Sequence, residues 1–316
     1  MELKIVFMGT PDFGAIILEG LVKNNYRPVL VITETDKPVG RKQVITPPPV
    51  KIMAQKYNIP ILQPSKILDT KCQLLDAKPD LIVVAAYGKI IPKEILDIPK
   101  YGCLNVHPSL LPRWRGASPI QYTILSGDEE AGTSIMLMDE KMDHGPILVN
   151  SKFKIPNSKL TTTELKSELA NLGVKLLVEI ITRWIEGKIK AVPQDDSKAT
   201  YTKIIKKDDG KIDWSKPAEE IERQIRAFDG WPESFTFWEK NDKLLRIKIL
   251  KARVLKSNEK ENYPIGKVLV VPQNDIGIQC AKDFLVIEKL QLEGKNEIDA
   301  EDFLRGYQEF AGTILR

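Results

Sequence analysis

Short apolar runs alternate with helical patterns through the first half of the chain. Continuous runs rich in Val and Ile predict buried strands at residues 3–8, 29–33, 81–86, 103–106 and 134–139. Between the first three strands, the spacing of apolar residues predicts helices at 15–22, 49–57 and 66–76. Apolar strands alternating with helices are typical of a parallel sheet that is covered on both faces. A further run at 147–155 would add an edge strand.

The pattern changes after a long helix that is expected to end at Gly187. Residues 161–164, Thr-Thr-Thr-Glu, have the spacing of a capping box, in which side chains bond the free N–H groups of a helix start. The apolar residues that then recur at helical intervals are Leu165, Leu169, Leu172, Leu176, Ile180 and Trp184. The polar stretch that follows, 188–207, is predicted to be a linker.

Beyond residue 207 the predicted elements are mostly short strands. One helix begins near Pro217, and strands follow at 234–239, 244–250, 266–271, 277–280 and 284–292. Their spacing and turn residues predict a small barrel of the oligonucleotide-binding (OB) kind, with a last helix from Asp299 packed on it. The expected fold class is therefore α/β, a Rossmann-like and mostly parallel sheet with helices on both faces, followed by a smaller OB-like β-barrel. The predicted domains are 1–187 and 208–316, joined by the linker.

Composition narrows the class of protein. The chain has 316 residues, two histidines and three cysteines that lie far apart in sequence. A disulfide framework and a zinc or multi-histidine metal centre both need more of these residues at closer spacing. No apolar run approaches the ~18 residues of a membrane span, and the first residues lack the pattern of a signal peptide. We expect a reduced, cytoplasmic protein without a bound metal.

The net charge of +4 is unevenly distributed. Residues 208–316 hold 18 Lys and Arg against 21 Asp and Glu, so the first 207 residues carry the positive excess. Two basic runs stand out, at 37–51, which contains Arg41 and Lys42, and at 240–256, which contains Arg246 and Lys248. Such runs are either solvated faces or surfaces that follow phosphates.

The glycine-bounded segment at 9–14, Gly-Thr-Pro-Asp-Phe-Gly, follows the first strand. It lacks the G-x-G-x-x-G fingerprint of dinucleotide sites, because Pro11 takes the place of the middle glycine and supplies no N–H group. Nicotinamide binding is therefore not expected. The segment is either a tight turn from strand to helix or one wall of an open cleft.

Asn105 and His107 are the most informative pair for chemistry. They are two residues apart on a predicted strand, so their side chains point to the same side, near the carboxyl end where open α/β sheets bind ligands. An amide beside an imidazole supplies an oxyanion donor and a proton acceptor. A hydrogen-bonded structural histidine is the alternative.

Asp143 lies in a loop bounded by Gly and Pro after another strand. It is either a turn former or the carboxylate that orients His107. The chain shows neither a Ser or Cys nucleophile elbow nor a phosphate-binding Walker loop. The chemistry indicated is direct transfer to an incoming nucleophile, without a covalent intermediate.

Several segments together resemble the methionyl-tRNA formyltransferase family, within the wider group of 10-formyltetrahydrofolate-dependent formyltransferases. The matching segments are 8–13, 86–88, 105–107, 109–117, 119–121, 138–145, 212–214, 226–228 and 231–232. They extend over nearly the whole chain. The Arg-Trp-Arg-Gly run at 113–116 and the matches beyond residue 207 favour the tRNA enzyme over other members of the group.

The resemblance implies a role for individual residues. Asn105, His107 and Asp143 match the catalytic trio of the family. The expected folate contacts are Ser109, Leu110, Leu111, Pro112, Tyr87, Gly88, Ile90 and Ile91, with the leucines and isoleucines as apolar walls for the pterin. Arg41 matches a basic residue that members of the family direct at the tRNA acceptor stem. From the two basic runs, Lys42, Arg246 and Lys248 are further expected tRNA contacts. Two positions depart from the family, since the 37–51 loop is sparse in basic residues and His144 stands where many members have a small polar residue.

The implied activity is transfer of the formyl group of 10-formyltetrahydrofolate to the α-amino group of methionyl initiator tRNA, for translation initiation. The implied organisation is a catalytic domain at 1–187 and a tRNA-binding barrel at 208–316, in a monomer that has no membrane partner. The alternative is a folate-dependent formyltransferase that acts on a small amine, such as glycinamide ribonucleotide or an amino sugar nucleotide. A small-amine enzyme has no need of an appended barrel that carries a basic run.

Overall fold

A computed structural model describes residues 3–40, 42–156, 159–257, 263–272 and 275–316. The chain forms two compact units. Unit 1 comprises residues 1–119, 130–155 and 164–203, and unit 2 comprises 120–129, 156–163 and 204–316. Each unit is described by itself below. Within the described residues, none of the helices is both long and apolar enough to span a membrane.

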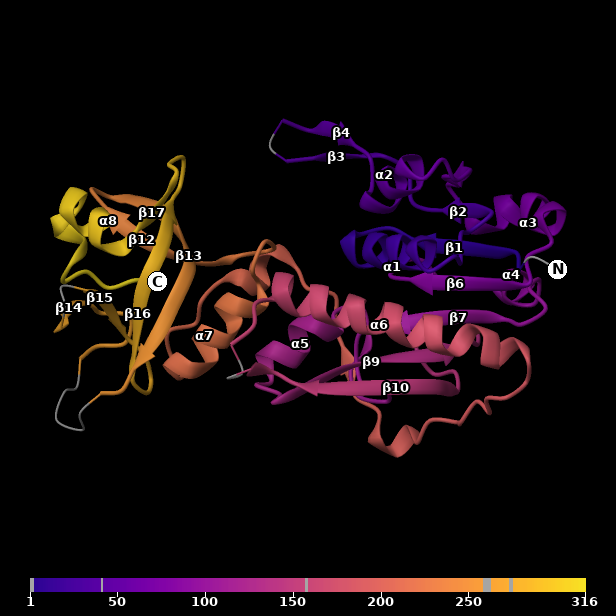
Figure 1. The fold of residues 1–316 in the computed structure, drawn as a ribbon. Helices are drawn as coiled ribbons and strands as arrows, with labels where there is room; N and C mark the ends of the chain where they lie inside the picture. The colour runs from indigo at the N-terminus through magenta and orange to yellow at the C-terminus, as the bar shows by residue number, and fades with distance from the viewer. Residues whose placement is uncertain (1–2, 41, 157–158, 258–262, 273–274) are drawn as a thin grey trace. The chain divides into compact units, whose positions relative to one another are not determined.

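Unit 1 is built on a seven-stranded sheet with the order β10-β9-β7-β6-β1-β2-β5 (Figure 1). Its elements are β1 (Ile5–Gly9), α1 (Asp12–Lys23), β2 (Leu30–Ile32), β3 (Lys37–Val39), β4 (Val44–Thr46), α2 (Pro49–Lys56), β5 (Ile61–Leu62), η1 (Ile67–Thr70), α3 (Lys71–Ala77), β6 (Leu81–Ala85), α4 (Lys93–Leu96), β7 (Cys103–His107), β8 (Arg115–Gly116), β9 (Glu130–Leu137), β10 (Ile147–Lys154), α6 (Thr162–Ile185), η3 (Asp196–Lys198) and β11 (Tyr201–Thr202). Strands β5, β2, β1, β6 and β7 run parallel, whereas β9 pairs antiparallel with β7 and β10 pairs antiparallel with β9. The carboxyl ends of the five parallel strands therefore share one edge of the sheet.

The two faces of this sheet are covered by different helices. On one face α1 and α6 lie side by side, since a Cβ on Gly20 of α1 would meet Val174 of α6 and one on Gly173 would meet Val106 of β7. On the other face, side chains of β1, β2, β6 and β7 form a buried core with η1, α3 and α4. Cys103 belongs to that second core. Because side chains alternate along a strand, Asn105 and His107 point to the same face as Cys103.

The segment at 9–14 is a tight turn from strand to helix. Gly9 ends β1, and α1 begins three residues later at Asp12. A Cβ on Gly9 or Gly14 would lie 2.7 Å from the carbonyl oxygen of Ala85, so only glycine lets this turn approach the end of β6. The segment is therefore a tight turn, as the first of the two interpretations predicts, and a role as one wall of a cleft stays a prediction.

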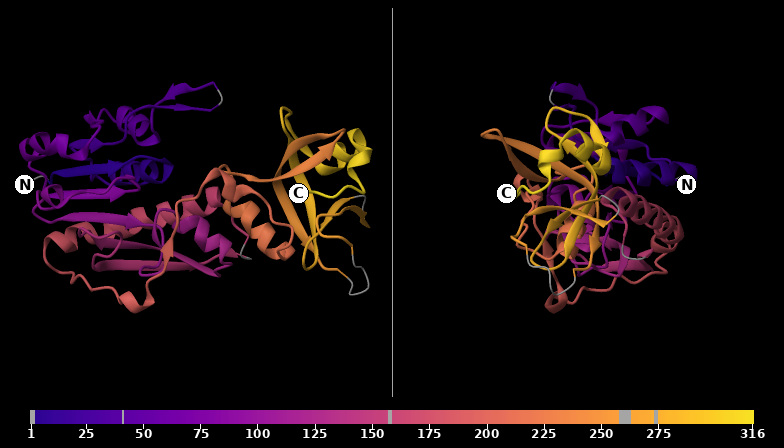
Figure 2. Two further views of the ribbon diagram at one scale, coloured as in Figure 1. Left: turned by 180° about the vertical axis from the view of Figure 1, so that it is seen from behind. Right: turned by 90° about the vertical axis from the view of Figure 1, so that its left-hand side faces the viewer.

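Unit 2 holds an antiparallel curled sheet with the order β12-β13-β16-β15-β14, with β17 paired to β16. Its elements are α5 (Pro119–Leu125), η4 (Lys207–Gly210), α7 (Ala218–Ala227), β12 (Ser234–Lys240), β13 (Lys243–Leu255), β14 (Val268–Val271), β15 (Asp275–Gln279), β16 (Phe284–Leu292), β17 (Glu297–Asp299), α8 (Ala300–Gly306) and η6 (Gln308–Phe310). The last residues of the chain bond to both edge strands: Phe237 of β12 exchanges two hydrogen bonds with Arg316, and Val268 of β14 exchanges two with Gly312 and Thr313. They thereby bridge the two edges of the sheet. The strands of this sheet are drawn in orange and yellow in both views of Figure 2.

The core of unit 2 lies between this sheet, α7 and α8. Trp238 is its largest buried side chain and packs edge-on against Phe303 and Phe310. The predicted fold class is confirmed, with a mostly parallel sheet covered by helices on both faces and a second unit built on a curled antiparallel sheet.

The predicted linker at 188–207 runs along unit 1 as far as Lys203. Within it β11 pairs with β8, and Trp114 donates its backbone N–H to the Thr200 hydroxyl at 2.8 Å. These contacts give the segment a fixed path. The bounds 1–187, 188–207 and 208–316 stay a prediction.

Candidate active site

Strand β7 positions the first two side chains of the site. Asn105 and His107 are 8% and 4% exposed, at the end of the parallel strand next to β6. The ring nitrogen Nε2 of His107 lies 3.0 Å from the carbonyl oxygen of Trp114. A carbonyl oxygen only accepts, so Nε2 carries the proton of the neutral ring. The other nitrogen, Nδ1, is then the atom that can accept a proton.

The loop between β9 and β10 brings Asp143 to this pair. Its Oδ1 lies 3.5 Å from Nδ2 of Asn105 and 3.6 Å from Nδ1 of His107. Its Oδ2 accepts the backbone N–H of Gly116 at 2.7 Å. The structure thus brings Asn105, His107 and Asp143 together. One carboxylate oxygen is anchored by the backbone while the other faces the amide and the imidazole.

The distances to Oδ1 are long for hydrogen bonds. Nδ1 of neutral His107 and a carboxylate oxygen are both acceptors, so a proton is needed between them before the contact becomes favourable. Once Nδ1 is protonated, the contact is an ion pair between two largely buried groups, with exposed side-chain fractions of 5% and 15%. The arrangement favours a histidine that gains and loses a proton during a reaction.

The segment 109–112 forms a turn that packs on β9. The Ser109 hydroxyl donates to the carbonyl oxygen of Arg113 at 2.6 Å, and the Ser134 hydroxyl donates to the carbonyl oxygen of Ser109 at 2.7 Å. The N–H of Leu111 donates in turn to the Ser134 hydroxyl, and the Leu111–Pro112 peptide is cis. Leu110 packs over Gly132, where a Cβ would lie 2.5 Å from its Cδ2. The turn is held internally and leaves Leu110 partly exposed.

The segment 87–91 follows β6 at the same edge of the sheet as the end of β7. Tyr87 and Ile91 are buried in the core beneath that edge, at 2% and 4% exposure, whereas Ile90 is 85% exposed. Burial raises the pKa of the Tyr87 phenol to about 12. Gly88 has a φ of +83°, a backbone conformation that favours glycine. In this structure Ile90 and the backbone around Gly88 are the parts of the segment open to a ligand.

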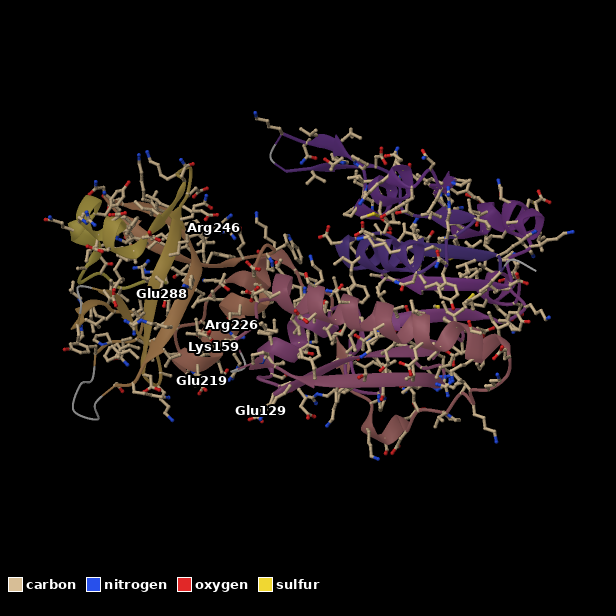
Figure 3. The ribbon with its side chains drawn as sticks, viewed as in Figure 1. Glu129, Lys159, Glu219, Arg226, Arg246 and Glu288 are labelled. Atoms are coloured by element: carbon tan, nitrogen blue, oxygen red, sulfur yellow. The ribbon has the colours of Figure 1, made fainter. Side chains whose placement is uncertain are left out.

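The expected tRNA contacts that the structure describes come from both units. Lys42 is exposed in the connection between β3 and β4, and Arg41 lies outside the described residues. Arg246 lies on β13 of unit 2 (Figure 3). Its guanidinium stacks 3.6 Å from the centre of the Phe235 ring. Lys248 on the same strand forms an ion pair with Glu233. The charge of Arg246 has no carboxylate partner among the described residues.

Two polar residues near Asp143 were not expected to contribute to the site. Arg115 is 1% exposed, and Gln194 comes from the predicted linker. Gln194 donates to the carbonyl oxygens of Asp143 and Gly145 and accepts two hydrogen bonds from Arg115. Arg115 had a signal in sequence, as part of the run at 113–116. Gln194 had none, because a single glutamine in a polar stretch is ordinary.

The second histidine, His144, lies outside the site. Its Nδ1 is 2.6 Å from Oδ2 of Asp139 and its Nε2 is 3.4 Å from Oδ2 of Asp196. A hollow of about 620 Å³ adjoins it, lined partly by Gly102, Leu137 and Asp139, and its lining includes none of Asn105, His107 or Asp143. Across the residues that the structure describes, no group of three or more His, Cys, Asp or Glu is arranged to hold a metal ion.

Comparison with protein families decides where the chain belongs. Residues 3–181 match the model described as formyl transferase, and residues 204–308 match that of the formyl transferase C-terminal domain. The chain belongs to the formyl transferase family. Both matches together cover the β7 and Asp143 site and most of the curled sheet of unit 2.

Curated relatives match over their whole length. A methionyl-tRNA formyltransferase from Bacillus velezensis is 43% identical over 315 residues, which cover 99% of this chain and 97% of that protein. One from Caldicellulosiruptor saccharolyticus is 43% identical over 317 residues, which cover 99% of this chain and all of that protein. Both halves of this family member are therefore present in its relatives.

Solved structures share the fold at lower identity. An N-formyltransferase from Helicobacter canadensis, solved with folinic acid and dTDP-3-aminofucose, has a TM-score of 0.65 at 21% identity and covers 90% of this chain and 98% of its own. HypX from Aquifex aeolicus, solved with tetrahydrofolic acid, has a TM-score of 0.63 at 16% identity and covers 98% of this chain and 48% of its own. These likenesses show the fold alone.

Proposed function

We propose that this chain transfers the formyl group of 10-formyltetrahydrofolate to the α-amino group of methionyl initiator tRNA. The observation that carries the proposal is the meeting of Asn105, His107 and Asp143 at the end of β7. It occurs in a chain whose relatives are methionyl-tRNA formyltransferases over their full length. The product, N-formylmethionyl-tRNA, is used in translation initiation, so the proposed compartment is the cytoplasm. The protein is proposed to act as a monomer.

The reaction exchanges one carbon–nitrogen bond for another. The α-amino nitrogen of the methionyl ester attacks the formyl carbon, and the formyl oxygen takes the negative charge of a tetrahedral intermediate. When the intermediate collapses, the bond from the formyl carbon to N10 of the folate breaks. The proton lost by the attacking nitrogen ends on N10. Neither a covalent enzyme intermediate nor phosphate energy is required.

Each residue of the trio has a role that its geometry supports. The Asn105 amide donates to the developing oxyanion, a type of interaction worth about 2.7–4 kcal/mol in comparable sites. Nδ1 of His107 takes the proton from the attacking amine, because Nε2 is already committed to the Trp114 carbonyl. The carboxylate of Asp143 stabilises the imidazolium that forms, 3.6 Å away. Nδ1 then delivers the proton to N10.

The formyl donor is proposed to bind at the edge of the sheet between segments 87–91 and 109–112. Leu110 and the 85%-exposed Ile90 provide apolar surface there for a pterin. Ser109, Leu111 and Pro112 shape the turn that presents Leu110. Tyr87 and Ile91 are buried, so we propose that they support Gly88 and Ile90 from below.

The tRNA is proposed to contact both units. Lys42 and Arg41 are proposed to meet the acceptor end, and Arg246 and Lys248 to follow the backbone. Arg246 is stacked on Phe235, which preorganises its charge, whereas Lys248 must exchange Glu233 for a phosphate. Replacing Lys42 or Lys248 by Gln should then lower the salt dependence of tRNA binding, by a slope of about 0.9 for each phosphate that is no longer neutralised.

One experiment tests the proposed function against its alternative. The protein is incubated with 10-formyltetrahydrofolate and, in separate reactions, methionyl initiator tRNA, glycinamide ribonucleotide, an amino sugar nucleotide or water alone. The acceptor that gains formyl is measured at two salt concentrations. We expect transfer to the tRNA, at a rate that falls steeply with salt. Transfer to a small amine but not to tRNA would replace the proposal by the small-amine activity.

A further inference from the structure

Gln194 reaches from the segment after α6 into the loop that carries Asp143. Its Nε2 donates to the carbonyl oxygen of Asp143 at 2.9 Å and to that of Gly145 at 2.8 Å. Its Oε1 accepts from Nε of Arg115 at 3.1 Å and from a terminal nitrogen of Arg115 at 2.8 Å. One carboxamide therefore joins the loop to a buried guanidinium, using both of its N–H groups.

The partners fix the orientation of this carboxamide. A guanidinium only donates and a carbonyl only accepts, so the amide oxygen must face Arg115 and the nitrogen must face the loop. Arg115 is held in turn by the Asp196 carboxylate at 2.8 Å and the Tyr201 hydroxyl at 3.3 Å. Arg115 is 1% exposed, so its charge depends on these partners. The anchor behind Gln194 is therefore rigid.

The loop needs such an anchor because its backbone is strained. Asp143 has a φ of +49°, in the left-handed region that residues with a side chain rarely adopt. At Gly145 a Cβ would lie 1.9 Å from the carbonyl oxygen of Leu137, so the loop returns in very close contact with β9. Strained conformations of this kind persist where the surroundings over-determine them.

We propose that Gln194 is a positioning residue for Asp143. This inference rests on the proposed function and names a residue that acts through another. Gln194 holds the backbone of Asp143 from one side, and the N–H of Gly116 holds its carboxylate from the other. Together they fix Oδ1 opposite Asn105 and His107. Without the two bonds from Gln194 the loop relaxes, and the carboxylate leaves the place where the imidazolium forms.

The substitution Gln194→Glu isolates the two donors. A glutamate keeps the length of the side chain and the contacts to Arg115, while it removes both N–H groups and faces two carbonyl oxygens with a carboxylate. We expect kcat to fall tenfold or more, with KM for tRNA and for the formyl donor within twofold of wild type. Gln194→Met removes the donors and the acceptor for Arg115 without adding charge, should show the same split and serves if Gln194→Glu does not fold.

Unit 2 contains a matched control. Gln224 is 7% exposed, and its Nε2 faces the carbonyl oxygens of Asp209, Gly210 and Lys211 at 3.3–3.5 Å. Gln224→Glu removes the same kind of donor from a loop of unit 2. We expect it to lower the melting temperature and to leave kcat within twofold. If Gln224→Glu lowered kcat as much as Gln194→Glu, the effect would be a general loss of stability and the proposal would be wrong.

A double-mutant cycle with Asp143→Asn separates positioning from structural support. If Gln194 acts through Asp143, the double variant should lose no more kcat than Asp143→Asn alone. Losses that multiply would overturn the proposal, as would an unchanged kcat or a rise in KM alone for Gln194→Glu. The wild-type reactions are run in parallel. If the wild type formylates a small amine or releases formate to water, the proposed acceptor fails, and the same cycle measured with that acceptor still tests Gln194.

Discussion

Both histidines of the chain lie next to aspartates, and the two differ in how deeply they are buried and in how closely the carboxylates approach them. His107 is 5% exposed at its side chain, and its Nδ1 stands 3.6 Å from Asp143. His144 is 31% exposed, and its Nδ1 lies 2.6 Å from Asp139, with Asp196 3.4 Å from its Nε2. His144, the more exposed of the two, thus has the shorter and more numerous carboxylate contacts.

With His107 as the proposed catalytic histidine, the closer carboxylate contacts in the structure belong to the other histidine, His144. The pairs of His144 are partly exposed, and water screens such pairs until they are worth about 0–1 kcal/mol. His107 has one nitrogen committed to a backbone carbonyl, while the other is left next to a carboxylate that it contacts fully only when protonated. A histidine that takes up a proton during a reaction needs a ring nitrogen that is not already engaged in a hydrogen bond. Four predictions test this comparison.

The largest effect is expected at the buried pair. His107→Ala and Asn105→Ala should each lower kcat about a hundredfold or more, which corresponds to about 2.7 kcal/mol of transition-state stabilisation. Stability should fall by only about 1–3 kcal/mol in His107→Ala, from the lost bond to the Trp114 carbonyl. Single-turnover rates and thermal unfolding measure the two effects. A His107→Ala enzyme with near-normal turnover would break the comparison, because His107 would then not be catalytic.

Asp143→Asn should have the next largest effect, with loss of most of kcat and retention of folate binding. The substitution keeps the size of the side chain and removes the charge that stabilises the imidazolium. The one amide oxygen is expected to keep accepting the Gly116 N–H, and the amide nitrogen then takes the place of the oxygen that faces Asn105 and His107. Turnover and equilibrium binding of 5-formyltetrahydrofolate measure the two properties. If folate affinity fell in step with turnover, Asp143 would be a binding residue and not a partner of His107.

Much of this site follows from sequence by simple geometry. Asn105 and His107 share a face because they are two apart on a strand, and the end of a parallel strand sets their place. The alternation of apolar strands and helices likewise predicts the sheet of unit 1, and the turn-rich short strands predict the curled sheet of unit 2. These features depend on local periodicity, which a single sequence displays directly.

The contacts that hold Asp143 depend instead on chain segments far apart in sequence. Gln194 lies 51 residues from Asp143, and the run that contains it shows no period or motif. Tyr87 and Ile91 were expected folate contacts from sequence, but both side chains are buried. The sequence pattern does not tell whether a side chain lines a site or is buried beneath it. Such outcomes are decided by tertiary packing, and one sequence carries no local signal for them.

A smaller effect, on stability, is expected for Asp196, one of the two aspartates that contact His144. The hydrogen bond from Arg115 holds the pKa of Asp196 below its ordinary value, against the opposing effect of burial. A carboxylate with a lowered folded-state pKa stabilises the protein above its unfolded-state pKa and loses that contribution as the pH falls. Asp196→Asn should therefore melt lower than wild type at pH 6, and the difference should shrink below about pH 4.

Asp229→Asn provides the control for this titration, since Asp229 is an exposed aspartate after α7. Its melting temperature should follow that of wild type throughout the same pH range. A difference for Asp196→Asn that stayed constant down to pH 3 would show that the Asp196 charge does not contribute.

The smallest effect is expected for His144→Ala, the same substitution as at His107. Its contacts to Asp139 and Asp196 are partly exposed, so their loss should cost less than about 1 kcal/mol and shift the melting temperature by less than about 4 °C. The Asp143 backbone is held by Gln194 and its carboxylate by Gly116, neither of which bonds to His144. We therefore expect kcat and KM within twofold of wild type at neutral pH. Steady-state kinetics of His107→Ala and His144→Ala, measured side by side, give the ratio of their kcat values directly. A tenfold loss of kcat in His144→Ala would mean that His144 also controls the loop of Asp143.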